Sequence, residues 1–214
     1  METTTITPYT TEWFKTRLGN FTASEIYRLM TEPKSKKEQF SKGAMTYILE
    51  KVHERLTGQS KQSFDTIATT WGVEHEGLAI FNFMKRTGIK VETAKYFVHP
   101  DMPKVGCTPD GLSEDGGVVE VKCPFNGVNH IEHCTIQDEA TFKETAKEYY
   151  WQMQHQMLVT GRKFGYFISF DPRINSEMGL FSIKINAVES DQLLLDTKLN
   201  SACMLADEFV KKFS

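Results

Sequence analysis

The chain has 214 residues, of which 40% are hydrophobic and 25% are charged, and it contains 14 glycines and 7 prolines. This composition is typical of a globular protein and excludes disordered, collagenous and fibrous classes. No run approaches the roughly 18 consecutive apolar residues that span a bilayer, and residues 1–9 lack the features of a signal peptide. We therefore expect a single domain in the cytoplasm, without a membrane partner.

The charge balance limits the partners of the protein. A net charge of -3 and a pI near 6.1 argue against a protein that coats nucleic acid without specificity. However, the first 64 residues carry an excess of basic side chains, and the remainder an excess of acidic ones. The basic group could follow a phosphate backbone, although a solvated helical face explains it equally well. Its members include Lys34, Lys36, Lys37, Lys42, Lys51, Arg55 and Lys61.

The cysteines give no sign of a cross-linked or metal-bound framework. They are dispersed and form no C-x-x-C pair, which argues against disulfides, structural zinc and a four-cysteine iron–sulfur cluster. A reducing compartment fits this usage. The four residues are Cys107, Cys123, Cys134 and Cys203.

The first third of the chain predicts helices. Thr22 to Glu25 fits a capping box that starts a short helix. A second helix is expected over residues 42–57 with Gly58 as its stop, and a third over residues 66–86 before Gly88.

The remaining sequence alternates between strand and helix patterns. Strands are expected at residues 90–99, 105–112 and 117–122, with a turn at 113–116. Then follow a long helix at 140–160, strands at 164–170 and 179–185, and a terminal helix at 188–213. This order predicts an α/β (α+β) fold, with a central mixed β-sheet flanked by helices.

The most informative segment is Pro109-Asp110, followed ten residues later by Glu120-Val121-Lys122. On a strand, Glu120 and Lys122 share one face, and Asp110 lies across the hairpin from them. Clustered carboxylates favour a cation such as Mg²⁺ or Mn²⁺ between them. A lysine beside such a site can orient or help deprotonate an attacking water. The plain alternative is an exposed hairpin with a cross-strand salt bridge.

A third acid is expected on the preceding helix, where Glu74 and Glu76 are available. Residues two apart point about 200° apart on a helix, so only one of them can face the sheet. Helical geometry alone leaves both open.

These residues resemble the PD-(D/E)xK nuclease superfamily, which has a restriction-endonuclease-like core. The likeness to the phage lambda exonuclease family of YqaJ-type viral recombination nucleases is closer and extends over residues 13–174. The matching residues are Trp13, Arg17-Leu18-Gly19, Thr22-Ala23-Ser24-Glu25, Trp71-Gly72, Glu76, Pro109-Asp110-Gly111-Leu112, Glu120-Val121-Lys122-Cys123-Pro124-Phe125, Gln152-Met153-Gln154, Val159-Thr160 and Asp171-Pro172-Arg173.

The resemblance implies a metal centre. It assigns Glu76, Asp110, Glu120 and the main-chain carbonyl of Val121 as ligands of two Mg²⁺ ions, which Mn²⁺ could replace. Lys122 is implied as the residue that positions the nucleophilic water.

The resemblance also implies a site for the 5′-phosphate of DNA, with Arg17 assisted by Ser24, Thr108 and Gln154. Arg17 lies just before the expected helix start at Thr22, and a helix N-terminus beside a guanidinium suits a phosphate. Thr22 could equally serve only as a cap. Thr108 stands where lambda exonuclease has serine; the hydroxyl is retained, and the extra methyl group stiffens the side chain.

Three further patterns were weighed. Of Gln152 and Gln154, only one can face the site, and the resemblance favours Gln154. The His130-x-x-His133-Cys134 segment is expected in a loop without a second zinc-ligand pair. The aromatic and methionine stripe in the long helix is expected to be a core face. Its residues are Tyr149, Tyr150, Met153 and Met157.

By resemblance, we expect a 5′-to-3′ exonuclease that digests double-stranded DNA to mononucleotides and leaves single-stranded 3′ overhangs. The family further implies a homotrimeric ring, a phage single-strand annealing protein as partner, and the cytoplasm of a bacterial host. The single domain would comprise a helical part at 13–88, a nuclease core at 66–186 and a helix at 188–213. Alternatives are a structure- or sequence-specific endonuclease on the same core, and a non-catalytic DNA-end-binding recombination accessory protein.

Overall fold

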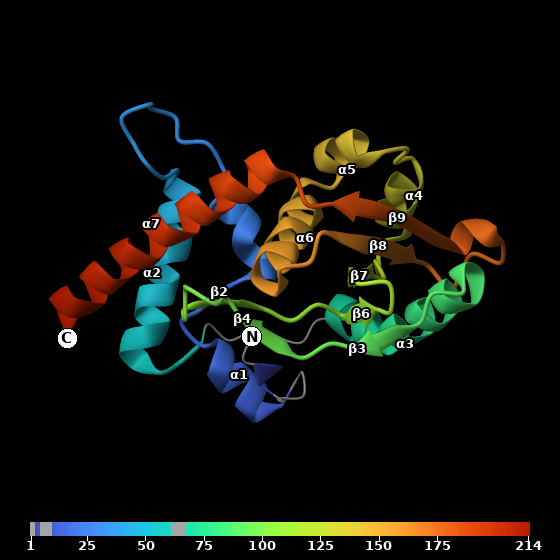
Figure 1. Ribbon diagram of the computed structural model, residues 1–214, viewed down its shortest axis with the longest axis horizontal. Coiled ribbons are helices and arrows are strands. Elements are labelled where there is room, and N and C mark those ends of the chain that lie inside the picture. Colours follow the sequence, from blue (N-terminus) through green and yellow to red (C-terminus); the bar gives the residue numbers. More distant parts are fainter. Residues whose placement is uncertain (1–2, 5–9, 61–66) are drawn as a thin grey trace.

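The computed structural model describes residues 3–4, 10–60 and 67–214, and it contains two β-sheets (Figure 1). The larger sheet has the strand order β3 (Val91–Thr93), β6 (Gly111–Ser113), β7 (Val118–Lys122), β8 (Phe164–Phe170) and β9 (Leu180–Asn186). The smaller sheet has the order β1 (Thr3–Thr4), β4 (Tyr96–Val98), β5 (Val105–Cys107) and β2 (Phe21–Thr22). Each sheet mixes parallel and antiparallel pairs, and β7 lies parallel to β8.

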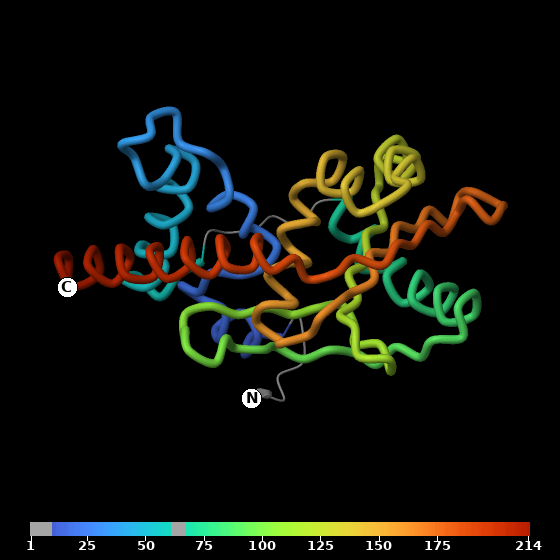
Figure 2. The backbone as a smooth tube through the Cα atoms, turned by 45° about the horizontal axis from the view of Figure 1, so that its top comes forward, coloured from blue at the N-terminus to red at the C-terminus, as the bar shows by residue number. Residues whose placement is uncertain are grey.

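Helices cover both faces of the larger sheet. The α-helices are α1 (Thr11–Arg17), α2 (Lys42–Thr57), α3 (Ile67–Thr87), α4 (Gly127–Cys134), α5 (Glu139–Thr145), α6 (Lys147–Thr160) and α7 (Glu189–Phe213), and the 3-10 helices are η1 (Ala23–Arg28) and η2 (Glu177–Gly179). Helix α3 packs on one face, whereas α4, α5 and α6 lie on the other (Figure 1). The long α7 runs beside α2 away from this sheet (Figure 2). This confirms the expected mixed sheet flanked by helices.

Strand β7 separates two apolar cores through its alternating side chains. Val118 belongs to the core beneath α6, together with Met153 and Phe167. Val119 and Val121 belong to the core beneath α3. Because side chains alternate along a strand, Glu120 and Lys122 must project on the α6 side.

Two expected strands are in fact interrupted, and each contributes to both sheets. The strand expected at 90–99 divides into β3 and β4, and the one expected at 105–112 divides into β5 and β6. Pro109 has no N–H to donate to a β-ladder, which is why pairing stops there. The interruption leaves Thr108 and Asp110 where the chain passes from one sheet to the other.

The capping box expected at Thr22 is wrong. Thr22 is extended and makes no side-chain cap bond, and the segment that follows is the 3-10 helix η1. Glu25 instead forms an ion pair of 2.9 Å with Arg28. In addition, Arg17 is the last residue of α1, a helix that the sequence patterns did not predict.

Two other expectations change in the central helical region. The helix expected at 140–160 is broken at Ala146, where φ is -124° and ψ is 48°, into α5 and α6. The segment with His130 and His133 is the helix α4, not a loop, and Asn126 caps its first turn. Thr66, the expected start of the third helix, lies outside the described residues. Among the helices that the structure describes, none is both long and apolar enough to cross a membrane.

Candidate active site

Asp110 is fixed to strand β7 from two directions. Its backbone N–H donates to the carbonyl of Val119 at 3.0 Å, and its Oδ2 accepts a hydrogen bond from the N–H of Val121 at 2.7 Å. Both bonds form because Asp110 directly precedes β6, the hairpin partner of β7. The carboxylate therefore lies at the end of the sheet, next to the main chain of Val121.

Glu120 is a buried carboxylate held by three donors. Its side chain projects toward α6 and is 1% exposed. Lys122 Nζ and Gln152 Nε2 donate to Oε1 at 2.5 and 2.6 Å, and Gln156 Nε2 donates to Oε2 at 2.5 Å. Gln152 and Gln156 are one helical turn apart, so they approach the carboxylate from the same face of α6.

Lys122 is a protonated ammonium at neutral pH. Burial opposes its charge, but the carboxylates of Glu120 and Asp110 outweigh burial and raise its pKa above the ordinary value. Its amine also lies 4.9 Å from the ring centroid of Tyr149. As arranged, Lys122 can donate a hydrogen bond to a water or a phosphoryl oxygen, which is the orienting role rather than that of a base.

A cavity of about 620 Å³ opens over Asp110 and Lys122, whereas Glu120 is buried and is not part of its lining. Glu76 from α3, Asp110, Val121 and Lys122 all line it. Glu76 is half-buried, whereas Glu74 is exposed and does not line the cavity. Of the two residues that helical geometry left open, Glu76 is thus the one that reaches the cavity, and it is also the one that the resemblance favoured.

The three carboxylates are crowded, and their proton affinities change accordingly. Burial, followed by the charges of Glu120 and Glu76, raises the pKa of Asp110 well above its ordinary value. Burial and the charge of Glu120 likewise raise the pKa of Glu76. A divalent cation would relieve this repulsion, and carboxylate and carbonyl oxygens are ligands that suit Mg²⁺ or Mn²⁺. The donor set therefore fits a metal centre.

The side chains are not yet arranged as metal ligands. Within residues 10–60 and 67–214, no three His, Cys, Asp or Glu side chains form a group that could hold a metal ion. The orientation of Glu120 gives the physical reason, since both of its oxygens accept hydrogen bonds from Lys122, Gln152 and Gln156. Oε1 accepts two of these bonds, so a cation could bind that oxygen only if Lys122 or Gln152 moved, whereas Oε2 accepts one bond and keeps a lone pair for a cation.

The loop that contains Phe125 forms one wall of this cavity, and hydrogen bonds hold it in place. Phe125 lines the cavity, and its carbonyl accepts a hydrogen bond from Arg173 at 3.1 Å. Asp171 holds the same guanidinium through Nη2 at 2.7 Å and thereby raises the pKa of Arg173. The guanidinium also stacks over Trp71, 4.9 Å from the ring centroid. The Asp171-Pro172-Arg173 and Trp71-Gly72 motifs are thus parts of one scaffold.

A second, smaller cavity of about 230 Å³ lies beside α1. Three of the five residues expected at a phosphate, Arg17, Thr22 and Ser24, line it. The guanidinium of Arg17 lies 3.8 Å from the ring centroid of Trp13. The indole N–H of Trp13 in turn donates to Thr108 Oγ1 at 3.1 Å. Thr108 therefore contacts this site through Trp13 and connects it to Asp110, two residues further along the chain.

Gln154 is not brought to either cavity. It is fully buried, and its amide donates to the carbonyl of Asn186 at 2.8 Å, whereas its Oε1 accepts from the N–H of Val188 at 3.2 Å and from Gln192. These bonds join α6 to the start of α7. The structure thus gives Gln154 a role at this joint, and it places Gln152 beside Glu120.

Sequence patterns assigned no role at the site to several residues that the structure places there. Gln156 could have been found from its i, i+4 spacing to Gln152. Tyr149 was assigned to the core with Tyr150, Met153 and Met157; these three are buried there, but Tyr149 lines the larger cavity. Lys51, which the sequence placed in the basic group of the first 64 residues, lines the smaller cavity from a different helix, but no local pattern links it to Arg17.

The histidine segment forms a buried network apart from both cavities. Nδ1 of His130 and Nδ1 of His133 each lie 2.8 Å from Ser169 Oγ. Burial lowers the pKa of His133 to about 4. The network ties α4 to β8 and gives both histidines a structural role.

Several solved structures are similar to this chain over most of its length. The alkaline exonuclease LHK-Exo from Laribacter hongkongensis superposes with a TM-score of 0.81 at 28% identity, over 95% of this chain and 96% of that chain. LHK-Exo in complex with dAMP gives a TM-score of 0.80 at 31% identity, with coverage of 95% and 96%. A phage-related exonuclease from Haemophilus somnus 129PT shares the fold, with a TM-score of 0.76 at 15% identity over 91% and 96% of the two chains. No curated protein matches the chain.

The sequence itself matches the YqaJ-like viral recombinase domain over residues 12–163. This range contains the carboxylates, Lys122 and the cavity beside α1. The fold, with its mixed sheet between helices, is that of alkaline exonucleases of the PD-(D/E)xK type. The chain therefore belongs to the YqaJ-like viral recombinase family, and this membership implies a DNA exonuclease.

Proposed function

We propose that the protein is a Mg²⁺-dependent exonuclease that degrades one strand of double-stranded DNA from a phosphorylated 5′ end. The observation that carries the proposal is the connection between the two cavities. Arg17 stacks on Trp13, Trp13 binds Thr108, and Asp110 follows two residues later at the carboxylates. A strand whose 5′-phosphate is bound beside Arg17 would present a nearby phosphodiester to Asp110 and Lys122.

The carboxylates would hold the catalytic ions. In this proposal Glu76, Asp110, Glu120 and the carbonyl of Val121 are the ligands, and Mn²⁺ could replace Mg²⁺. When bound, such ions lower the pKa of a coordinated water and stabilise the leaving 3′ oxygen. Lys122 would donate to the water or to a non-bridging oxygen, because it is already charged and needs no proton transfer to act.

Arg17 would select the end of the DNA. A guanidinium can form two parallel hydrogen bonds with a phosphate, which favours a terminal phosphomonoester over a hydroxyl. Ser24 and Thr22 add hydroxyl groups to the same cavity. Gln154 has no place in this proposal, because its amide already bonds at the joint between α6 and α7.

The biological setting follows from the family and is also proposed. Mononucleotides would leave after each cut, and the intact strand would remain as a 3′ single-stranded overhang. We further propose that a homotrimeric ring keeps the enzyme on DNA, and that a phage single-strand annealing protein receives the overhang in the cytoplasm of a bacterial host. The ring would place a positively charged lining near the DNA despite the net charge of -3.

The experiment compares linear duplexes that differ only in 5′ phosphorylation, with Mg²⁺ and with chelator, alongside a closed circular plasmid. We expect mononucleotides from the phosphorylated 5′ strand, slower digestion of the hydroxyl end, and an intact plasmid. Arg17→Ala should slow the phosphorylated substrate far more than the hydroxyl one. Cleavage of the closed circle would favour an endonuclease, and activity in chelator would refute the metal requirement.

A further inference from the structure

We infer that Lys51 is the second cation of the cavity beside α1 and a specificity-determining residue for the 5′-phosphate, an inference that rests on the proposed function. Lys51 and Arg17 line the same cavity of about 230 Å³, but they come from different helices. Lys51 is 7% exposed, so its amine is a fixed part of the wall and not a mobile surface charge. The wall of this cavity holds two cations, three hydroxyl groups and the carboxylates of Glu25 and Glu54. Two cations with hydroxyl donors in a cavity of this size suit a single phosphate group.

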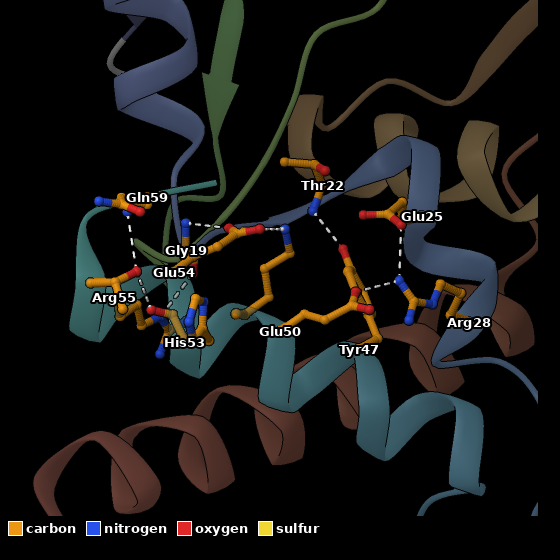
Figure 3. A network of polar contacts seen from close by, with 12 residues as sticks. Gly19, Thr22, Glu25, Arg28, Tyr47, Glu50, His53, Glu54, Arg55 and Gln59 are labelled. Carbon is orange, nitrogen blue, oxygen red and sulfur yellow. Dashed lines mark hydrogen bonds and ion pairs between the residues drawn. The ribbon is translucent and has the colours of Figure 1, made fainter. Parts of the chain in front are cut away.

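Glu54 holds the amine of Lys51 in place. Lys51 Nζ lies 3.0 Å from Glu54 Oε1 and 3.1 Å from Oε2, so one carboxylate takes both contacts. An ammonium has three N–H donors, and these contacts leave one for a ligand in the cavity. Glu54 Oε2 also accepts the N–H of Gly19 at 2.8 Å, a bond visible in Figure 3.

The same helix fixes the turn that carries Arg17. Arg55 Nε donates to the carbonyl of Gly19 at 2.8 Å. Because Glu54 accepts the N–H of Gly19, residues of α2 bind both the N–H and the carbonyl of this glycine. Gly19 has a φ of 70°, and an added Cβ would also collide with the side chain of Arg55. Because Gly19 follows Arg17 by two residues, α2 sets the position of Arg17 as well as that of Lys51.

The charges around the cavity are arranged so that a phosphate meets no uncompensated carboxylate. Glu54 is paired with Lys51, and Glu25 is paired with Arg28 at 2.9 Å. Figure 3 shows Glu25 turned toward Arg28. Without Lys51, the carboxylate of Glu54 would face the phosphate as an unpaired negative charge. Lys51 thus has two separable effects, a direct contact and the neutralisation of Glu54.

Variants of the full-length protein can separate these effects. Lys51→Gln removes the charge but can still donate to Glu54, and Lys51→Arg keeps the charge. Glu54→Gln removes the carboxylate but can still accept the N–H of Gly19. Lys42→Gln is the matched control, because Lys42 is an exposed lysine of the same helix that lines a different cavity.

The readout is the ratio of affinities for 5′-phosphorylated and 5′-hydroxyl duplexes, measured by fluorescence anisotropy in chelator, with kcat/KM ratios in Mg²⁺ as the second measurement. We expect Lys51→Gln to lower both ratios about tenfold or more, the loss expected for a hydrogen bond to a charged group. Lys51→Arg should retain most of the preference. Lys42→Gln should change both ends equally. If the wild type prefers the 5′-phosphorylated end and Lys51→Gln leaves both ratios unchanged, the inference is wrong and the proposed function remains intact.

The double variant Lys51→Gln/Glu54→Gln decides between contact and neutralisation. A direct contact predicts that the double variant stays as impaired as Lys51→Gln, whereas Glu54→Gln alone keeps or increases the preference. Recovery of the wild-type ratio in the double variant would show that Lys51 only neutralises Glu54, and the inferred contact would be wrong. Equal affinity of the wild type for both ends would refute the proposed end recognition, and with it the role of Lys51.

Discussion

The two glutamines beside Glu120 offer a matched test of how the buried carboxylate is held. Gln152 and Gln156 each donate one hydrogen bond to it, and both are buried. They differ in their other amide atom, because within the described residues Oε1 of Gln156 is buried without a hydrogen-bond partner. Substitution of either glutamine by methionine removes the side-chain amide and keeps a side chain of similar length.

The magnitudes follow from this difference. A hydrogen bond to a charged acceptor contributes about 1.5–3 kcal/mol, so Gln152→Met should lower the free energy of unfolding by that amount. Gln156→Met loses a similar bond but also removes an unsatisfied carbonyl, whose burial costs about 1–3 kcal/mol. We therefore expect Gln156→Met to be close to neutral. For a chain of this size, Gln152→Met should lower Tm by roughly 3–12 °C.

Urea unfolding and thermal melts in chelator measure both variants without interference from metal. A Glu120→Gln background supplies the control: its acceptor is uncharged, so the cost of Gln152→Met should fall to about 0.5–1.5 kcal/mol. A Gln156→Met variant that is less stable than Gln152→Met would refute the reasoning, as would an undiminished cost in the Glu120→Gln background.

Three further predictions concern stability and catalysis. Gly106→Ala places a Cβ 2.7 Å from the carbonyl of Phe97, so we expect a loss of about 3 kcal/mol or more in urea unfolding. Lys122→Met should reduce the rate of cleavage at least about a hundredfold while DNA-end affinity in chelator stays near that of the wild type; near-normal cleavage would contradict its role. Burial lowers the pKa of His133 to about 4 and of His155 to about 3, so the unfolded state binds protons first as pH falls below the ordinary histidine value. The histidine contribution to stability should therefore fall between pH 6.5 and 4, by at most about 2 kcal/mol for His133 at pH 5, whereas protonation of Asp110 and Glu76, whose pKa values are raised, favours the folded state as pH falls. A difference in urea midpoint between the wild type and His133→Leu that does not change with pH would contradict the histidine contribution.

The fold class and the chemistry of β7 could be predicted because both depend on local periodicity. Alternation along a strand places Glu120 and Lys122 on one face, and the structure shows both toward α6. Likewise, Gly58 and Gly161 adopt the left-handed backbone conformation and end α2 and α6 at the positions where the sequence predicts that these helices end. Signals of this kind involve residues within a few positions of each other.

Features that depend on contacts between distant segments could not be predicted. Nothing near Lys51 in the sequence shows that it shares a cavity with Arg17, because the two residues are brought together by bonds from Glu54 and Arg55 of α2 to Gly19, in the turn after α1. Gln154 was assigned by resemblance, but the orientation of a buried glutamine depends on which neighbours offer partners, here Asn186 and Val188. The division of each long strand between two sheets is also a tertiary effect.

That division of the strands has a functional consequence at Thr108. An unbroken strand would have carried Asp110 along one sheet, away from α1; the interruption at Pro109 keeps Thr108 against Trp13 while Asp110 pairs with β7. Two hydrogen bonds and one stacked pair therefore fix the separation between the cavity beside α1 and the carboxylates. If that cavity binds the 5′-phosphate, as proposed above, a fixed separation means that a bound 5′ end always presents the same phosphodiester for cleavage. We infer that this linkage makes the product length uniform, and a mixture of oligonucleotide lengths from the wild-type digestion would show that it does not.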